Sequence, residues 1–298
     1  MKRNVTQRAI SWAGSKKIFN FLPDKPYLQL MFWARMGQKL DLINPKSLNE
    51  KVQWLKLNDY KDSYPSIADK YEVRSYIKET LGDEYLVPLV GGPWANWEQV
   101  DIAKLPNQFV LKTTHDSGGV VVCADKQALN CKKAKEKIEK SLKNNYFWSG
   151  REHPYKYIKP QIIAEQYLTD ESGLELKDYK ILCMDGVPQN VMVCTGRLQG
   201  NVKYYFFDLD WKFLPLNHGD DQLPKDFTLP RPKHLDEMVR IAKILSKDFK
   251  LLRVDLYEAN NRVYFGEMTF YPDSGFDTDI LPSTDMDFGS RLVLGENH

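Results

Sequence analysis

The chain has 298 residues, of which 28% are charged, and its formal net charge at pH 7 is only +2. This length and composition are typical of a soluble globular protein with one large enzyme fold or two ordinary domains. The near-neutral charge argues against a dedicated nucleic-acid binder, which usually carries an excess of basic residues. The four cysteines have neither CxxC spacing nor a nearby histidine, which indicates no zinc site or disulfide framework and favours a reducing cytoplasm.

The first 62 residues are predicted to form a helical N-terminal region. The segment lacks an apolar run of the roughly 20 residues that span a bilayer. The basic residues near its start are Lys2, Arg3, Arg8, Lys16 and Lys17. Aromatic and aliphatic residues lie between them. Such a segment could lie on an anionic membrane surface. Docking of its aromatic side on the protein itself is the more ordinary alternative.

Helices and strands are predicted to follow in separate blocks. Ser47 and Glu50 have the spacing of a capping box, which predicts a helix over 47–57, and a second helix is predicted over 69–81. Between about 104 and 165 the pattern becomes strand, glycine turn, strand, lysine-rich helix and strand. From about 166 onward, antiparallel strand patterns dominate. This segregation predicts an α+β fold.

The glycine turn lies in FVLKTTHDSGGVVV, residues 109–122. Lys112 is near the end of the first strand, and the adjacent Gly118 and Gly119 follow in the loop. Glycines let a backbone approach a ligand closely and turn N–H groups toward phosphate oxygens, and a lysine adds a positive point charge. The pattern is neither of the helix-opening phosphate motifs. A phosphate-binding loop and a plain Gly-Gly hairpin therefore both stay open.

A hairpin near the C-terminal end carries one acidic residue on each apolar strand, Asp255 on 253–258 and Glu267 on 262–270. If 259–261 form a three-residue loop, the two carboxylates lie diagonally on the same face. A two-residue loop would place them on opposite faces, because a one-residue slip inverts every side chain.

On one face, the two carboxylates would repel unless a cation lies between them or one takes up a proton. Mg²⁺ prefers oxygen ligands and is one interpretation. Pairing of each acid with a nearby base, such as Arg253 or Arg262, is the other. The hairpin alone leaves both open.

The order of these parts resembles the ATP-grasp superfamily. The segments that carry the resemblance are SLNEKVQWLKL, ADKYEVR, LPNQFVLKTTHDSGG, DYKILCMDG and RVDLYEANNRVYFGEMTFYPDSGF. They look like its TupA-like branch, which is associated with bacterial surface-polysaccharide and teichuronopeptide synthesis. The resemblance covers about 44–289. It implies an ATP-grasp domain over 63–298, with a lid subdomain at about 104–165 and a C-terminal antiparallel subdomain at about 166–298, which together clasp ATP.

The resemblance also implies a nucleotide site. Lys70 and Lys112 would grip the phosphates of ATP, and the loop of Gly118 and Gly119 would fold over them. Asp178 matches the acid that meets the ribose. The hinge against adenine would consist of four consecutive residues: Glu165, Gln166, Tyr167 and Leu168.

Asp255 and Glu267 match the residues that hold Mg²⁺ on the β- and γ-phosphates. Thr269 stands where ATP-grasp enzymes commonly have Asn, and a hydroxyl is a weaker ligand than an amide carbonyl. Arg253 is a candidate for holding an acyl phosphate, because its planar fork matches phosphate or carboxylate oxygens. A structural salt bridge is its alternative. Lys180 could assist, or it could be a solvent-facing lysine on an edge strand.

The implied reaction is an ADP-forming carboxylate–amine ligation in the cytoplasm. The carboxylate would belong to a sugar acid of a capsule or other surface polysaccharide, or to its lipid-linked precursor, and the amine to an amino acid or small amine. A lipid-linked acceptor would bring the enzyme to the inner membrane face. Asp208 and Asp210 form a DxD pattern, which suggests a glycosyltransferase as the alternative, although a polar hairpin turn explains the same residues.

Overall fold

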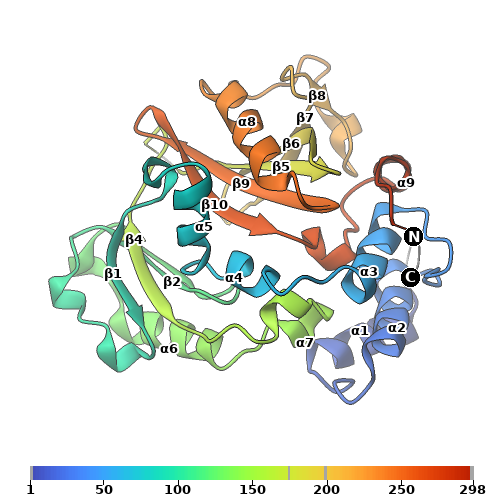
Figure 1. Cartoon of the computed structure of the whole chain (residues 1–298), viewed down its shortest axis with the longest axis horizontal. Helices are drawn as coiled ribbons and strands as arrows, with labels where there is room; N and C mark the ends of the chain where they lie inside the picture. The colour runs from blue at the N-terminus through green and yellow to red at the C-terminus, as the bar shows by residue number, and fades with distance from the viewer. Residues whose placement is uncertain (1–2, 174, 198–199, 296–298) are drawn as a thin grey trace.

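The computed structural model of the chain describes residues 3–173, 175–197 and 200–295. Two antiparallel sheets face each other, with the helices of the N-terminal region packed at one end, as Figure 1 shows. The smaller sheet has the strand order β1-β4-β2-β3 and the larger has the order β10-β9-β5-β6-β7-β8. Separate helical and antiparallel blocks confirm the predicted α+β class.

The N-terminal region is helical, as predicted. Its helices are α1 (Val5–Ser15), α2 (Asp24–Met36) and α3 (Leu48–Asn58), and they are followed by the short helices α4 (Tyr64–Ala68) and α5 (Val73–Thr80). Ser47 caps α3 by accepting a hydrogen bond from the Glu50 N–H, and the Glu50 side chain accepts one from the Ser47 N–H in return. The predicted capping box is therefore confirmed.

The smaller sheet combines β1 (Leu89–Trp94), β2 (Phe109–Thr113), β3 (Val120–Cys123) and β4 (Ile162–Gln166). Helices α6 (Cys131–Leu142) and α7 (Phe147–Gly150) lie between β3 and β4 in the chain. The lysine-rich α6 buries Ala134, Ile138 and Ser141 and leaves its charged residues outside. Since β1 belongs to this sheet, the sheet begins at Leu89, before the predicted lid boundary at about 104.

The larger sheet combines β5 (Asp178–Met184), β6 (Val187–Thr195), β7 (Lys203–Phe207), β8 (Phe213–Leu214), β9 (Leu251–Ala259) and β10 (Arg262–Thr269). Helix α8 (Leu235–Ser246) packs on β5, β6 and β9, and α9 (Pro282–Arg291) packs on α3. The apolar face of α8 and the inner face of this sheet form the main hydrophobic core. The opposite face of the sheet is left for the polar residues described below.

The turn of the C-terminal hairpin differs from the three-residue loop that we considered. It has two residues, Asn260 and Asn261, with φ of 52° and 57°, and Ala259 pairs with Arg262. Positive φ at both central positions fits the twist of a tight hairpin, and asparagine tolerates it well. By itself this turn would put Asp255 and Glu267 on opposite faces.

A bulge at Gly266 restores the same-face arrangement. It adds one residue to β10, so that Glu267 lies directly opposite Asp255. A β-carbon at position 266 would come within 2.9 Å of the Asp255 carbonyl oxygen and 3.1 Å of the Tyr257 ring. Glycine is needed here because the two backbones approach closely. The two acids therefore meet, but through a bulge and not through a longer loop.

Removal of the α3 cap is expected to weaken the fold measurably. Ser47→Ala loses the hydrogen bond to the N3 backbone and should lower the free energy of unfolding by about 1 kcal/mol. Urea denaturation followed by circular dichroism measures this change. Ser63→Ala is the matched control, because Ser63 precedes α4 without a side-chain cap. Equal effects of the two substitutions would contradict the capping role of Ser47.

Candidate active site

A cavity of about 500 Å³ lies between the two sheets. Its walls come from β2, β3 and β4 of the smaller sheet and from β5, β6, β7, β9 and β10 of the larger one. The predicted site residues line it, with the exception of Gly118 and Gly119, whose neighbours Ser117 and Val120 do so. The sequence-based predictions therefore converge on one place.

One row of side chains crosses the larger sheet and forms a continuous part of the cavity wall. The backbone register pairs Glu267 with Asp255, Asp255 with Lys180, and Lys180 with Met192. Each of these residues lines the cavity. Directly opposed residues on neighbouring strands have their side chains on the same face. The sheet register itself therefore sets two acids and a lysine side by side.

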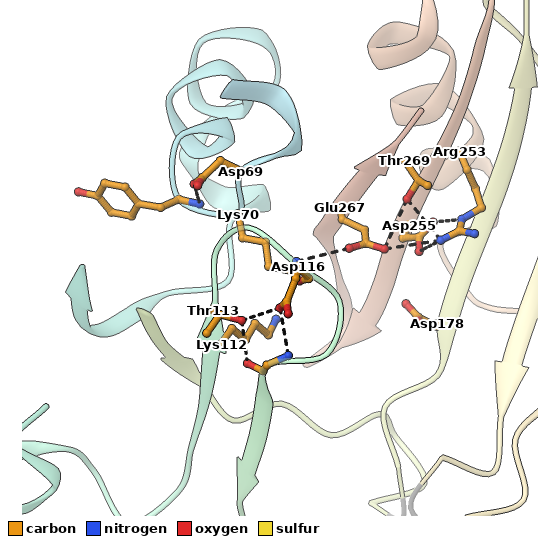
Figure 2. Close-up of polar contacts among 12 residues, drawn as sticks. Asp69, Lys70, Lys112, Thr113, Asp116, Asp178, Arg253, Asp255, Glu267 and Thr269 are labelled. Atoms are coloured by element: carbon orange, nitrogen blue, oxygen red, sulfur yellow. Dashed lines mark hydrogen bonds and ion pairs between the residues drawn. The ribbon is translucent and has the colours of Figure 1, made fainter. Parts of the chain in front are cut away.

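The two lysines predicted to bind phosphate lie on the side of the smaller sheet. Lys112, on β2, donates to the Glu165 carboxylate over 2.5 Å. Lys70 donates to the Asp116 carbonyl oxygen over 2.5 Å, and its Nζ lies 4.0 Å from Glu267 Oε2. Figure 2 shows the Lys70 side chain extending from the turn between α4 and α5 toward Glu267 of β10. These contacts place two positive charges in the wall of the cavity.

The glycine loop is held by the carboxylate of Asp116, which is buried. It accepts hydrogen bonds from the hydroxyls of Thr113 and Ser141, each over 2.6 Å, and from the Gly119 N–H. A β-carbon at Gly119 would lie 1.9 Å from the Thr113 hydroxyl oxygen, whereas at Gly118 it would make only an ordinary contact. Gly119 is thus required by the packing of the loop, whereas Gly118 is not.

The predicted hinge lies at the end of β4 and just beyond it. Glu165, Gln166, Tyr167 and Leu168 line the cavity. The Glu165 carboxylate is 3.6 Å from Arg74 as well as bound to Lys112, and the Gln166 N–H donates to the Pro88 carbonyl. The side chain of Glu165 and the backbone of Gln166 are therefore both held in place by contacts within the protein.

One carboxylate oxygen of Asp178 receives no hydrogen bond from the described part of the chain. Its Oδ2 accepts from Arg197 over 2.6 Å and lies 3.1 Å from Lys180, whereas its buried Oδ1 has no hydrogen-bond partner within the described part of the chain. A buried acceptor without a partner is costly unless a donor completes it. A hydroxyl group such as that of a ribose provides such a donor.

Lys180 is not the solvent-facing edge lysine that the sequence left as an alternative. It lies on β5, inside the sheet, and is 5% exposed. Burial opposes its charge, but the carboxylates of Asp255 and Asp178 outweigh burial and raise its pKa. Lys180 therefore stays protonated between the two acids.

Asp255 is held by two cations. Arg253 donates to it through Nε over 2.7 Å and through Nη2 over 3.0 Å, and Lys180 donates from the other side. Burial alone would raise the pKa of Asp255, but Arg253 and Lys180 outweigh it and lower this pKa to about 2. Asp255 is therefore paired with basic residues, as the ion-pair interpretation of the hairpin expected.

The remaining oxygens of the hairpin face the cavity. Glu267 has a side chain that is 35% exposed, and its only cationic neighbours among the described residues are Arg253 at 3.5 Å and Lys70 at 4.0 Å. Thr269, two residues further on the same face, donates weakly to Glu267 over 3.4 Å (Figure 2). Glu267 and Thr269 thus present oxygen atoms to the cavity beside Asp255, whose own oxygens accept from Arg253 and Lys180. Oxygen-only donors of this kind suit Mg²⁺, a metal that keeps water and phosphate in its other positions.

The DxD residues lie elsewhere and close a turn. Asp208 Oδ1 accepts from the N–H groups of Asp210 over 3.0 Å and Lys212 over 2.7 Å, and Trp211 has φ of 69°. Neither aspartate lines the cavity. The polar-turn explanation is the one that the structure supports.

Other cavity residues were missed by the sequence interpretation. They include Tyr146, Glu152, Tyr155, Arg197, Tyr204 and Asp273. No local motif marks any of them, because they come from loops and strand edges that only the tertiary fold brings together.

A family model described as TupA-like ATP-grasp matches residues 50–293. The chain belongs to this family. Membership confirms the predicted fold and the class of enzyme, an ATP-dependent ligase with ATP and Mg²⁺ as cofactors. A search of curated proteins gave no match.

Solved structures similar to this chain are themselves ligases. D-alanine–D-alanine ligase from Helicobacter pylori has 15% identity and a TM-score of 0.44 over 83% of this chain and 69% of that one. The enzyme from Bacillus anthracis complexed with ATP has 15% identity and a TM-score of 0.42 over 76% and 62%. L-amino acid ligase from Bacillus licheniformis has 15% identity and a TM-score of 0.42 over 90% and 56%. The chain thus spans 56 to 69% of their lengths.

The Asp255 ion pairs predict a pH dependence of stability in the absence of Mg²⁺. A carboxyl whose pKa is lowered on folding stabilises the protein above its ordinary pKa and loses that contribution as the pH falls through the folded value. For a shift from 3.8 to about 2 this contribution is about 2 kcal/mol. The difference in unfolding free energy between wild type and Asp255→Asn should therefore narrow as the pH falls from 5 toward 2.

Urea denaturation in EDTA at several pH values measures this difference. Asp210→Asn, at an exposed position, is the control and should show a constant difference from wild type. An Asp255→Asn difference that does not change with pH would contradict the assigned ion pairs.

Proposed function

We propose that the protein is an ADP-forming carboxylate–amine ligase that forms an amide on a sugar-acid carboxylate of a bacterial surface polysaccharide or its precursor. The reaction passes through an acyl phosphate. The observation that carries the proposal is the alignment across the cavity. Lys70 and Lys112 on one side face the oxygen set of Asp255, Glu267 and Thr269 on the other, with Arg253 beside it.

The first step brings a carboxylate to the γ-phosphate of ATP, so two anions must approach each other. Lys70 and Lys112 neutralise and orient the phosphates, which reduces this repulsion. When bound, Mg²⁺ held by Asp255, Glu267 and Thr269 adds positive charge beside the same oxygens. Attack on phosphorus releases ADP and leaves the acyl phosphate.

Arg253 suits the role of holding the acyl phosphate. It uses Nε and Nη2 for Asp255 and Thr269, and no acceptor in the described residues contacts its Nη1. One edge of the guanidinium is therefore fixed, and the rest can donate to an oxyanion. Lys180, between Asp178 and Asp255, keeps these two acids in place and so positions the metal ligand.

The proposed sugar-acid substrate is supported by the resemblance to the TupA-like branch, which is associated with surface-polysaccharide synthesis. Tyr146, Tyr155 and Tyr204 line the cavity beyond the hairpin and offer aromatic faces and hydroxyls of the kind that bind sugars. The amine then displaces phosphate from the acyl phosphate and forms the amide. An amino acid or another small amine is the proposed second substrate.

The nucleotide product tests the proposal. Purified protein is incubated with ATP, Mg²⁺, a panel of uronic acids including D-glucuronate and D-galacturonate, and amines including amino acids, ethanolamine and putrescine. ADP and phosphate should form, one per amide, with the product mass recorded. AMP with pyrophosphate, or consumption of a nucleotide sugar without ATP, would rule out this mechanism.

Substitutions in the metal set should abolish this turnover. Glu267→Gln and Asp255→Asn each remove a charged ligand and should lower ADP formation by about 100-fold or more. Asp208→Asn is the matched control, since its carboxylate only closes a surface turn, and should keep nearly full activity. The opposite ranking would favour the glycosyltransferase.

A cytoplasmic enzyme that touches the inner membrane face is part of this proposal. No helix of the described chain is long and apolar enough to cross a bilayer. Helix α1 buries Gln7 and Gly14 against α2, and Arg8, Trp12 and Lys16 recur on its opposite face. Helix α1 contains no acidic residue. Basic and apolar groups on one outward face suit an anionic lipid surface.

Vesicle binding tests this membrane contact. Trp12 is 60% exposed and Phe21 is 78% exposed. Sedimentation with phosphatidylglycerol vesicles should carry down the wild type, and the double variant Trp12→Ser, Phe21→Ser should lose most of this binding. Phosphatidylcholine vesicles should bind little. Ile43→Ser, at a position that is 90% exposed, is the control for loss of a surface apolar residue. Equal binding by all variants would refute the contact.

A further inference from the structure

The cavity lining includes a group of acidic residues that we call the acid-lined end. The acidic residues that line it there are Glu152, Asp273, Asp277 and Asp279. The basic residues that line the cavity are those already described around the nucleotide and the hairpin: Lys70, Lys112, Lys180, Arg197 and Arg253. Glu152 lies near Asp273, and Asp277 lies near Asp273 and Asp279, so negative charge gathers in this part of the cavity.

Glu152 differs from the other acids of this group because it is buried. It is 3% exposed, and no lysine, arginine or histidine nitrogen in the described chain lies within 4.0 Å of its carboxylate. Its partner is the hydroxyl of Ser274. Asp273 and Asp279 are exposed, and Asp277 is half-buried. Glu152 is thus a cavity carboxylate that is shielded from water but is not neutralised by an ion pair.

A buried lysine fixes the surroundings of Glu152. Lys56 of α3 is 2% exposed and donates to the carbonyl oxygens of Gly150 and Ser274, each over 2.7 Å, and to the Ser274 hydroxyl over 2.9 Å. Ser274 therefore bridges Lys56 and Glu152. Gln53 adds hydrogen bonds to the same turn. These contacts join the residues before Glu152 to the turn after β10.

The turn that presents Ser274 is strained, which indicates that it is held in place by its contacts. Asp273 and Ser274 have φ of 48° and 55°, and Gly275 follows with φ of 61°. Consecutive left-handed residues that are not glycine cost free energy and persist where the surrounding structure determines them. The hydrogen bonds of Lys56 and Gln53 provide that determination.

Burial makes Glu152 a stronger base than a carboxylate in water. Burial raises its pKa, and Asp273 adds to this effect, while Lys56, Ser274 and Arg253 lower it only in part. Tyr146, Tyr155 and Tyr271 are the other titratable groups near it. Burial lowers the pKa of Lys56 itself to about 7. A carboxylate in this environment is better suited to accept a proton near neutral pH than one in water.

We propose that the acid-lined end receives the amine substrate as its ammonium form and that Glu152 is the catalytic base that takes its proton. This inference rests on the proposed ligase function. The ammonium gives one proton to Glu152, and the freed lone pair forms the C–N bond while the C–O bond to phosphate breaks. The electron pair of that bond leaves with inorganic phosphate, which takes the second proton. Glu152 then returns its proton to solvent.

Replacement of Glu152 separates the two half-reactions. Glu152→Gln keeps the size of the side chain but accepts no proton. With the uronic acid that wild type uses best, the first-turnover release of ADP should stay within about threefold, because the acyl phosphate forms without a base. Amide formation from the fastest amine of the panel should fall by about 100-fold or more.

Hydroxylamine provides an internal comparison, because it is largely unprotonated at neutral pH and needs no base. Hydroxamate formation by Glu152→Gln should stay within about threefold of wild type. With the protonated amine, the rate of amide formation by Glu152→Gln should rise about tenfold per pH unit, because the fraction of free amine rises by that factor. The rate of the wild type should rise less steeply. Glu152→Asp should recover part of the lost rate. A structural role alone would change none of these ratios.

Glu258→Gln is the matched control for loss of a buried carboxylate. Glu258 is 8% exposed, pairs with His234 and does not line the cavity. Its variant should keep both rates. A Glu152→Gln variant that loses hydroxamate and amide formation equally, or neither, overturns the assignment of Glu152 while the ligase function stands. A wild type that forms no ADP with any acid of the panel overturns the proposed function and this assignment with it.

Discussion

The buried carboxylate of Asp255 is the interaction on which the geometry of the site depends. It lies in the middle of a cross-strand row, with Lys180 on one side and Glu267 on the other. Arg253, two residues earlier on the same strand, donates hydrogen bonds to it. Moving any one of the three strands by a residue would break the row. The register of β5, β9 and β10 therefore determines which charged side chains meet in the site.

Burial of so many charges is a poor way to gain stability. Ion pairs inside a protein recover at best part of the desolvation cost, and an apolar cluster of similar size often stabilises more. Arg253, Lys180 and Asp255 are each 12% exposed or less as side chains. We infer that the network is kept because the proposed chemistry needs fixed charges of both signs in the cavity, with Asp255 already deprotonated where a metal and phosphates would bind.

Much of this arrangement could be predicted from the sequence because local signals carried it. The capping box of α3, the strand lysine before the glycine loop and the acidic residue on each strand of the hairpin depend on neighbours a few residues apart. The hairpin shows the limit of such reasoning. The Asn-Asn turn indicates a two-residue loop, but nothing around Gly266 announces a bulge, and the bulge decides which face Glu267 occupies.

The Glu152 environment could not be predicted for a related reason. Lys56, Glu152 and Ser274 are separated by about a hundred residues each along the chain, and each is ordinary in its local sequence. Their contact depends on how α3 packs against the turn after β10. Buried polar contacts of this range become visible only when the fold is known, whereas a glycine or a cap is visible from its own segment.

Arg151 and Glu152 explain why the N-terminal region belongs to the same structural unit as the cavity. Arg151 has φ of 58° and is 1% exposed, and its guanidinium donates to the carbonyls of Asn20 and Leu22 and lies 4.2 Å from the Tyr27 ring centre. The next residue, Glu152, lines the cavity. The left-handed backbone at Arg151 thus sends two consecutive side chains in different directions, one into the helical region and one into the site. Displacement of α2 would move Arg151 and, through one peptide unit, the carboxylate of Glu152. The first helices are therefore a support for the chemistry as well as a surface of the molecule.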